Sequence, residues 1–506
     1  MARADLLKHL VVFGVAGLIG CSFVVFGAHV YPLPGADSFA FVPPAVMQKR
    51  GDGLLNPLSR LSGVVDPSGA DRYLEYPPLF PLLVSALMPT ASADGAFLVI
   101  SSFSAVTALL LAALLLRWTK STTVGAPWAR IVALTCSLAG CATWLVGAQS
   151  GRPEALAALL SLLLLHVVLG GPSLLGWLVA GAIVGLTGAT QPTAGAILGL
   201  LLVVVASLWL PTWRAAVVSA ASAVTAVGVF LVVIALGPFS MRDTLRGIAA
   251  HARLVGGRDP SGSLAYYWLT NPSATFMGMA FVVFLALGLA RLRRDPGCVR
   301  SWPVLVAGSI GLAGFGWWAA IRVPELAYNL QFLTPAVFAG TFLAIRRQSK
   351  GRASGRALFA VAAVHAICAV GYLRYVLLLG VHLSSGVELQ VARRSFNEIL
   401  AGRTGPVAVT PSLWVLTEDY RRLVVCGSDR DARDCGASIL VVQQSYSGSM
   451  VPPHIPGFEL VRDRFVRTPC AVGGVKLASS VPGYGFAVYH PIGGAALGPS
   501  AKGDNP

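Results

Sequence analysis

The sequence has few charged residues and many long apolar runs. Only 12% of its 506 residues are Asp, Glu, Lys or Arg, and 55% are hydrophobic. Soluble globular proteins carry about 25% charged residues, so this chain lacks the polar surface that a soluble protein of its length requires. Together with a mean hydropathy of +0.71, this composition excludes a soluble protein and indicates an integral membrane protein.

Acidic residues are scarcer than basic ones: 22 Asp and Glu against 38 Lys and Arg give a net charge of +16. A basic chain can bind nucleic acid, but such proteins carry a basic stripe or patch on one face. Here the basic residues lie in short loops between apolar runs, which is typical of the charge bias that orients membrane proteins. We expect no nucleic-acid partner.

The eight cysteines form no CxxC pair and no Cys/His cluster with zinc spacing, so no structural zinc site is expected. The sequence assigns no metal ligands, and a bound divalent metal stays an open alternative. Cys426 and Cys435 enclose a polar stretch, and an extracytoplasmic location would favour a disulfide between them. Two free thiols, or a bond to Cys470, are the alternatives.

About eleven apolar runs approach the length of about 20 residues that a membrane-spanning helix needs. They are residues 10–30, 96–116, 131–147, 155–169, 174–189, 194–210, 215–236, 276–290, 304–321, 326–345 and 358–379. The first is longer than a signal-peptide core and has no clear cleavage site, so we expect it to be retained as an anchor. Residues 78–89 are apolar but short and contain prolines, which predicts a re-entrant or interfacial helix.

The basic loops test this count of spans. If residues 78–89 do not span and the N-terminus is inside, every strongly basic short loop lies on the cytoplasmic side, as the positive-inside rule requires. These loops contain Arg117, Lys120 and Arg130; Arg214; Arg291, Arg293, Arg294 and Arg300; and Arg346, Arg347, Lys350, Arg352 and Arg356. The sequence therefore predicts a multi-pass protein of the plasma (inner) membrane with a cytoplasmic N-terminus.

The chain divides into a transmembrane domain at residues 1–380, with outer loops at 31–94 and 237–274, a more polar domain at 381–492, and a tail at 493–506 that we expect to be disordered. Residues 391–400 read as a helix, and residues 407–410, 438–443 and 486–489 read as strands. The predicted fold class is an α-helical polytopic membrane protein of about eleven transmembrane helices. It has interfacial helices in the first outer loop and a small C-terminal α/β extracytoplasmic domain.

Asp37 lies in the first outer loop, a few residues after the first span. A carboxylate at this depth can reach a substrate whose tail lies in lipid and whose head is in water. Partial desolvation would make it a usable general base. Alternatively, Asp37 caps a helix that begins at Ser38.

The order of the motifs resembles that of a known superfamily. Asp37 is followed by Tyr-Pro-Pro-Leu-Phe-Pro at residues 76–81 and by Gly-Arg-Pro-Glu-Ala-Leu at residues 151–156; Gln-Pro-Thr at 191–193 and the stretch 324–335 are weaker matches. Over about the first 350 residues, this order resembles the dolichyl-phosphate-mannose protein mannosyltransferase-like superfamily. These are fold type C (GT-C) glycosyltransferases, a group that includes lipid A aminoarabinose transferases.

The resemblance implies a hexosyl- or pentosyltransferase of the cell envelope. Such an enzyme moves a sugar with inversion from a polyprenyl-phosphate carrier to an acceptor glycan, lipid or protein at the outer membrane face. Asp37 matches the aspartate that is taken to deprotonate the acceptor hydroxyl. Ser38 departs from the pattern, because many members carry a second acid there; Asp52, Asp66, Asp71 and Glu75 are the other candidates for that acid.

A phosphate leaving group requires cations. The second outer loop supplies Arg242, Arg246, Arg253 and Arg258, with His251, on a stretch whose apolar spacing predicts an amphipathic interfacial helix. The same arginines could instead contact anionic lipid head groups. The remaining candidate substrate-binding residues lie in the first outer loop or at outer ends of spans: Arg72, Glu75, Arg152, Glu154 and Arg322.

Two other functions fit the sequence less well. A non-catalytic membrane protein that binds a lipid-linked glycan would be consistent with Ser38 in place of an acid. A transporter is disfavoured, because the sequence shows no internal repeat and its charges collect at the outer ends of spans rather than in mid-membrane.

Overall fold

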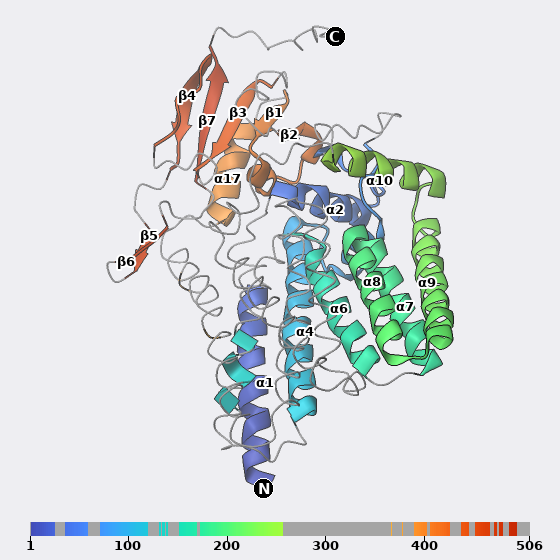
Figure 1. Cartoon of the computed structure of the whole chain (residues 1–506). Helices are drawn as coiled ribbons and strands as arrows, with labels where there is room; N and C mark the ends of the chain where they lie inside the picture. Colours follow the sequence, from blue (N-terminus) through green and yellow to red (C-terminus); the bar gives the residue numbers. More distant parts are fainter. Residues whose placement is uncertain are drawn as a thin grey trace.

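The computed structural model describes residues 2–25, 36–58, 71–119, 151–169, 173–256, 389–401, 405–425, 437–444, 451–465, 470–472, 475–478 and 485–492, with isolated residues between 131 and 139 and at 366 and 377. In this part of the chain, long apolar helices lie side by side, with the N-terminus at one end and a C-terminal sheet at the other (Figure 1). The helices are α1 (Ala2–Val25), α4 (Ala93–Thr119), α6 (Glu154–Leu169), α7 (Leu174–Thr190), α8 (Pro192–Trp209) and α9 (Thr212–Ala235).

Each of these helices coincides with a predicted span. α1, α4 and α9 contain stretches long and apolar enough to cross a membrane, and α6, α7 and α8 are shorter apolar helices. A polytopic membrane protein is thereby confirmed. The other five predicted spans lie outside the described residues, apart from isolated helical residues between 131 and 139 and at 366 and 377.

The first helix extends beyond the first predicted span at its N-terminal end. α1 begins at Ala2 rather than at residue 10, and it includes Asp5 and Lys8. Ala, Leu, Arg and Lys are all good helix formers, so the helix continues through the polar residues. Apolarity predicts which residues contact lipid, but it does not mark where the helix begins.

Short helices lie across the end of this bundle that faces the sheet. They are η2 (Ala36–Ala40), α2 (Val42–Arg50), α3 (Leu79–Leu87) and α10 (Met241–Gly256). Figure 1 shows α2 beneath the sheet and α10 to its right, above the end of α9. α3 has nine residues and rises only about 14 Å, which is too short to cross a bilayer. The short helix that we predicted at residues 78–89 is therefore present and does not span.

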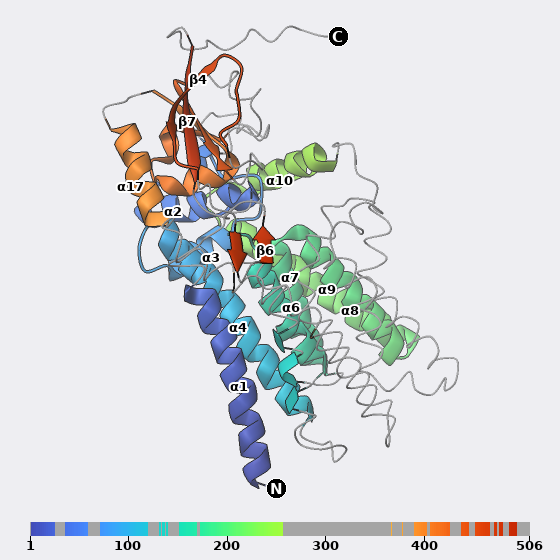
Figure 2. The same ribbon diagram turned by 90° about the vertical axis from the view of Figure 1, so that its left-hand side faces the viewer.

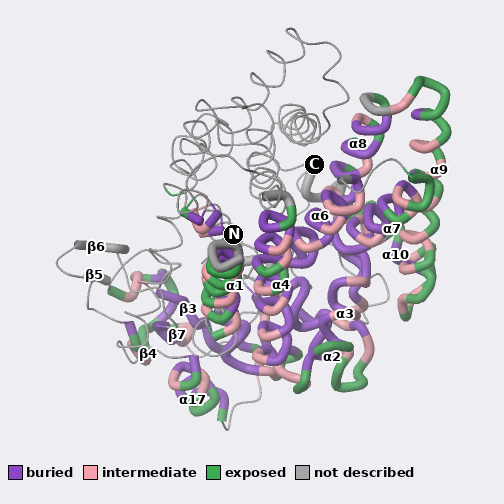
Figure 3. The backbone as a smooth tube through the Cα atoms, turned by 90° about the horizontal axis from the view of Figure 1, so that it is seen from below, coloured by how far each residue is buried: buried purple, intermediate pink, exposed green. Residues whose placement is uncertain are grey.

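Neighbouring long helices pack in the order α1, α4, α6, α7, with α9 against α7. Between α7 and α9, the hydroxyl of Ser222 donates a hydrogen bond to the carbonyl of Trp177 at 3.0 Å. Such bonds between helices help to hold membrane proteins together. Figure 3 shows buried residues where the helices meet and many exposed residues along α9, where Val217, Val224 and Val232 present apolar surface.

The C-terminal sheet has the strand order β2-β1-β3-β7-β4. β1 (Val407–Val409) pairs in parallel with β2 (Leu423–Val425) and β3 (Ile439–Gln443), whereas β7 (Phe486–Pro491) pairs antiparallel with β3 and β4 (Phe458–Asp463). β5 (Cys470–Val472) and β6 (Val475–Ala478) form a separate pair. The three predicted strands are present as β1, β3 and β7, and the predicted helix is present as α17 (Leu389–Leu400).

The sheet buries both faces. On one face, Val407, Val441 and Phe486 belong to a hydrophobic core that is continuous with the core between the long helices. α17 covers this face, and Phe396 meets Phe486 edge to face at 6.1 Å between ring centroids. Leu440, Ala487 and Tyr489 on the other face form a second, smaller core. The sheet is thus packed directly onto the helical part of the molecule.

Candidate active site

Asp37 lies in η2, which packs against α2 and against Pro411–Leu416 of the C-terminal part. The capping interpretation expects a helix that begins at Ser38, directly after Asp37. The 3-10 helix begins instead at Ala36, so Asp37 lies within it. The next residue, Ser38, is 0% exposed. Its hydroxyl oxygen accepts a hydrogen bond from the indole N–H of Trp414 at 3.1 Å. The side chain of Asp37 lies outside the described set.

A tight turn at residues 151–153 packs directly against η2. Gly151 has φ +81°, a left-handed conformation that favours glycine. A Cβ atom at Gly151 would lie only 2.8 Å from Cβ of Ser38 and 3.1 Å from the ring of Phe97. The absence of a side chain therefore allows the turn to approach the residue next to Asp37. It brings Arg152 and Glu154, which are distant in sequence, to the same end of the bundle.

Arg152, Glu154 and Gln191 form a buried polar cluster. Nη2 of Arg152 lies 2.7 Å from Oε1 of Glu154, and the two side chains are 13% and 4% exposed. Nε2 of Gln191 donates to the same carboxylate oxygen at 3.4 Å. Glu154 is the first residue of α6, and Gln191 is the single residue between α7 and α8. Both therefore lie at the ends of apolar helices, and Glu154 was predicted at the end of a span.

This cluster has unused hydrogen-bonding capacity. Among the described residues, the other carboxylate oxygen of Glu154 and the side-chain carbonyl of Gln191 are buried and accept no hydrogen bond. A buried acceptor without a donor costs free energy. Two such acceptors in one cluster suit a ligand that brings hydroxyl groups, as a sugar does.

α10 is attached to the first outer loop. Nη1 of Arg72 lies 3.3 Å from Oδ2 of Asp243, and its guanidinium lies over the ring of Phe239, 5.8 Å from the centroid. At Gly247 a Cβ atom would lie 2.4 Å from the carbonyl oxygen of Leu74, so the helix backbone rests on the loop backbone. The two outer loops that were predicted to meet on one side of the membrane are thus in direct contact.

Aromatic rings extend this contact to the segment that follows η2. Tyr76 lies between Phe41 and His251, with ring centroids 4.6 Å and 4.5 Å apart. Phe41 also meets Phe80 of α3 edge to face. The segment that carries Asp37 is therefore joined through stacked rings to α10.

The predicted arginines of α10 fall into two groups. Arg242 and Arg246 are exposed on the helix, and so are the neighbouring apolar side chains of Met241 and Leu245. Thr244, on the opposite side of the helix, is buried. This arrangement is the amphipathic helix that the sequence predicts. The backbone of Arg253 belongs to α10, but its side chain, together with Arg258 and Arg322, lies outside the described residues.

The acids of the first outer loop have separate environments. Asp52 lies 3.9 Å from Arg421 of the C-terminal part, and the carbonyl of Asp71 accepts a hydrogen bond from Asn56. Glu75 is buried. Burial raises the pKa of Tyr73 well above its usual value, and Tyr76 and Glu75 act in the same direction, so this phenol stays neutral. Asp66 lies outside the described residues.

Within the described residues, no three His, Cys, Asp or Glu side chains gather as a metal site would require. The tentative disulfide cannot be located in the structure, because Cys426 and Cys435 lie outside the described residues.

Two residues near the site were not among the predicted site residues. Gln191 stood in a recognised motif, and its place between two apolar helices was the available signal. Trp414 had no signal in the sequence, because its contact with Ser38 joins residues 376 positions apart.

No protein-family model matches the sequence, and no curated protein sequence matches it significantly. Among solved structures, the chain is similar to ArnT (an aminoarabinose transferase) from Cupriavidus metallidurans in the apo state, with 14% identity, 99% of this chain and 100% of that chain covered, and a TM-score of 0.55. The chain is likewise similar to the same protein bound to undecaprenyl phosphate. The identity is 15%, with 97% of this chain and 99% of that chain covered, and the TM-score is 0.54.

The chain is also similar to an oligosaccharyltransferase from Archaeoglobus fulgidus in the apo form. The identity is 11%, with 87% of this chain and 66% of that chain covered, and the TM-score is 0.50. Both neighbours are GT-C fold glycosyltransferases. These likenesses show that the chain has the GT-C fold, as the order of its motifs implied.

Proposed function

We propose that this chain, which has the GT-C fold, is an inverting glycosyltransferase that moves a sugar from a polyprenyl-phosphate carrier to an acceptor at the outer membrane face. The observation that carries the proposal is the convergence of η2, the turn at residues 151–153 and α10 at the end of the bundle farthest from the N-terminus. The carrier class is supported by the neighbour ArnT, which binds undecaprenyl phosphate.

The proposed orientation follows from the basic loops. The N-terminus is cytoplasmic in an inner-membrane protein of about eleven spans, and residues 381–492 form an extracytoplasmic domain before the tail at 493–506. η2 and α10 then lie where the bilayer meets water. A carrier can keep its polyprenyl chain in lipid there while it presents its phosphate and sugar to the protein.

In the proposed reaction, Asp37 removes the proton from the acceptor hydroxyl as that oxygen attacks the anomeric carbon. The bond between the anomeric carbon and the phosphate oxygen breaks, and the polyprenyl phosphate leaves with the electron pair. Attack from the face opposite the leaving group inverts the configuration.

The buried cluster of Arg152, Glu154 and Gln191 is proposed to hold the sugar. The acceptor oxygens of Glu154 and Gln191 that lack donors among the described residues would take hydrogen bonds from its hydroxyl groups. Arg242, Arg246, Arg253, Arg258 and Arg322 are the candidates for phosphate. Arg72 is less suited to bind substrate, because it contacts Asp243 and Phe239.

The test is transfer by the purified protein from a panel of polyprenyl-phosphate sugars, with wild type compared with Asp37→Asn. Loss of a positioned general base lowers kcat by about 10²- to 10⁴-fold, and the donor KM should change little. Asp463→Asn is the control, because Asp463 lies on the edge strand β4 of the C-terminal sheet and not in the first outer loop. It should retain wild-type kcat.

Two outcomes would overturn the proposal. Saturable donor binding without a product in the wild type would indicate a non-catalytic lipid-glycan-binding protein. Accumulation of sugar in sealed vesicles without a glycosyl product would indicate a transporter.

A further inference from the structure

We propose that Trp414 is a positioning residue through which the C-terminal domain fixes η2, and with it Asp37, for the transfer reaction. The inference rests on the proposed function, because it assumes that Asp37 acts on the acceptor. It also gives the C-terminal domain a role in positioning the catalytic residue. A domain that only covered the site would have no such role.

Trp414 is held on every side. It lies in η6 (Pro411–Leu416) and is 0% exposed. Its ring stacks on Phe97 of α4 at 6.2 Å between centroids and meets Tyr420 edge to face at 6.0 Å. Phe97 is also the ring that a side chain at Gly151 would touch. One packed cluster therefore joins the C-terminal domain, α4, the turn at residues 151–153 and η2.

The bond between Trp414 and Ser38 has a fixed direction. An indole N–H can only donate, so the Ser38 hydroxyl must accept at 3.1 Å. Because Trp414 and Ser38 are both buried, loss of the acceptor would leave a buried donor unsatisfied. This contact also gives Ser38 a role where many members of the resembled superfamily carry a second acid. Here position 38 anchors the helix that carries the acid at position 37.

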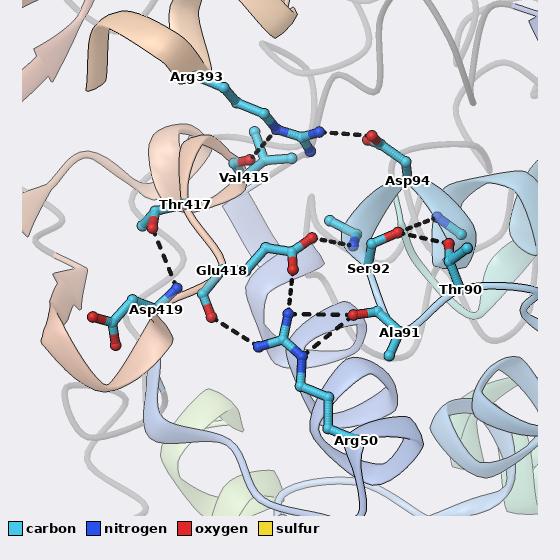
Figure 4. A network of polar contacts seen from close by, with 12 residues as sticks. Arg50, Thr90, Ala91, Ser92, Asp94, Arg393, Val415, Thr417, Glu418 and Asp419 are labelled. Carbon is cyan, nitrogen blue, oxygen red and sulfur yellow. Dashed lines mark hydrogen bonds and ion pairs between the residues drawn. The ribbon is translucent and has the colours of Figure 1, made fainter. Parts of the chain in front are cut away.

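A network of ion pairs and hydrogen bonds fixes η6 relative to the bundle (Figure 4). Arg50 of α2 pairs with Glu418 and also donates to the carbonyl of Ala91. Arg393 of α17 lies 2.6 Å from Asp94 at the start of α4 and donates to the carbonyl of Val415 at 3.0 Å. The position of Trp414 relative to α4 is therefore fixed. Its indole N–H in turn fixes the position of η2 through the hydrogen bond to Ser38.

Positioning of this kind affects turnover more than donor affinity. A displacement of about 1 Å at a catalytic group can cost about 10²-fold in rate. Without the bond, η2 keeps its packing against η6 and its own backbone contacts, such as the amide of Phe41 donating to the carbonyl of Ser38. It loses the hydrogen bond from Trp414 that fixes its position relative to the C-terminal domain. Partial displacement should therefore lower kcat by about tenfold.

The experiment is a double-mutant cycle. Trp414→Phe keeps a ring but removes the N–H, and Ser38→Ala removes the acceptor with the smallest change in volume. Each should lower kcat about tenfold with an unchanged donor KM. The double variant should be no slower than the slower single variant, since both remove one bond. Tyr489→Phe is the matched control. It removes the hydrogen bond that the Tyr489 hydroxyl donates to the carbonyl of Pro453, which lies within the C-terminal domain but away from η2. Its kcat should equal that of wild type.

Hydrogen–deuterium exchange of residues 36–41 supplies a readout that needs no activity. Ser38→Ala and Trp414→Phe should both speed exchange of these amides, and Tyr489→Phe should not. If the wild type shows no transfer activity but both variants exchange these amides faster than it does, the contact between Trp414 and η2 holds and only the glycosyltransferase proposal is overturned. Unchanged exchange in Ser38→Ala, or multiplicative losses of kcat in the double variant, would overturn the role of Trp414.

Discussion

At the scale of single residues, Glu154 divides its two carboxylate oxygens between different environments. One oxygen is held by Arg152 and Gln191, and the other is buried without a donor among the described residues. The first set of contacts keeps the side chain in place. The second oxygen is the one that a sugar hydroxyl would reach.

Glu154→Gln should therefore lower kcat/KM for the donor. A hydrogen bond to a charged group contributes about 1.5–3 kcal/mol, which corresponds to a loss of about 10- to 150-fold. The measurement is steady-state transfer with the donor that the panel identifies. Glu398→Gln is the control, because Glu398 also pairs with an arginine, Arg462, but lies on α17. Equal losses in both variants would contradict a role for Glu154 in sugar binding.

Tyr420 predicts how stability depends on alkaline pH. Burial raises the pKa of Tyr420, and nearby Glu418 acts in the same direction. In the unfolded chain a tyrosine ionises near pH 10, so above that pH the unfolded state binds fewer protons than the folded state. The free energy of unfolding must then fall as the pH rises, whereas below pH 10 this contribution is fully present.

Tyr420→Phe removes this proton linkage. The variant should lose less stability than wild type between about pH 10 and pH 11.5, as measured by thermal unfolding in detergent. At neutral pH it should be at least as stable, because the Tyr420 hydroxyl is buried and has no hydrogen-bond partner among the described residues. Parallel alkaline losses in the two proteins would contradict the assignment.

The sequence singled out some residues of the candidate site and not others. Glu154 and Arg152 were predicted because ionisable residues at the end of an apolar run are conspicuous, and their role in binding stays a prediction. The contact of Trp414 with Ser38 could not be found, because it depends on how the C-terminal domain packs against η2. Local pattern carries no information about such a contact.

At the scale of elements, the turn at residues 151–153 depends on a single glycine. Gly151→Ala should lower kcat, because the new methyl group would lie 2.8 Å from Cβ of Ser38 and would push η2 away. Gly457→Ala is a matched control. Gly457 has a similar φ of +82°, but nothing lies within 4 Å of an added Cβ.

Both substitutions place alanine in the left-handed region, which costs about 1–2 kcal/mol. Both variants should therefore show a lowered Tm, but only Gly151→Ala should lose at least tenfold in kcat. Transfer assays and thermal unfolding on the same preparations measure the two effects. A kcat of Gly151→Ala equal to that of Gly457→Ala would show that the turn does not position η2.

The exposed side of α10 should bind phosphate groups at the membrane surface. In proteoliposomes, Arg242→Gln combined with Arg246→Gln should abolish stimulation of transfer by anionic lipid, since each basic residue near such a surface contributes about 1 kcal/mol. A rise in donor KM that is the same in every lipid would instead assign the arginines to the carrier phosphate. Arg462→Gln, on the sheet, is the control, and no change in either quantity would contradict the interfacial role.

Elements were predictable where burial leaves a simple pattern. The long helices follow from apolar runs, and α17 follows from its buried positions at Leu389, Ala392, Phe396 and Ile399. β2 was not predicted, although it has three residues like β1, which was. β4 was missed because it is an edge strand whose Leu460 and Val461 are both exposed, so it lacks the alternation that marks a half-buried strand.

At the scale of the whole molecule, the structure is polarised along the bundle. The N-terminus lies at one end, and the first outer loop, the turn at residues 151–153, α10 and the sheet gather at the other (Figures 1 and 2). The sheet shares a continuous core with the bundle. The C-terminal part is therefore packed directly against the end of the bundle where the candidate site lies.

The most direct measurement of this account is an experimental structure of the protein with undecaprenyl phosphate bound. Phosphate density is expected at the end of the bundle nearest the sheet, within reach of η2 and the buried pair of Arg152 and Glu154. Phosphate density at the N-terminal end, near Arg117, would place the carrier away from Asp37 and contradict the proposed transfer.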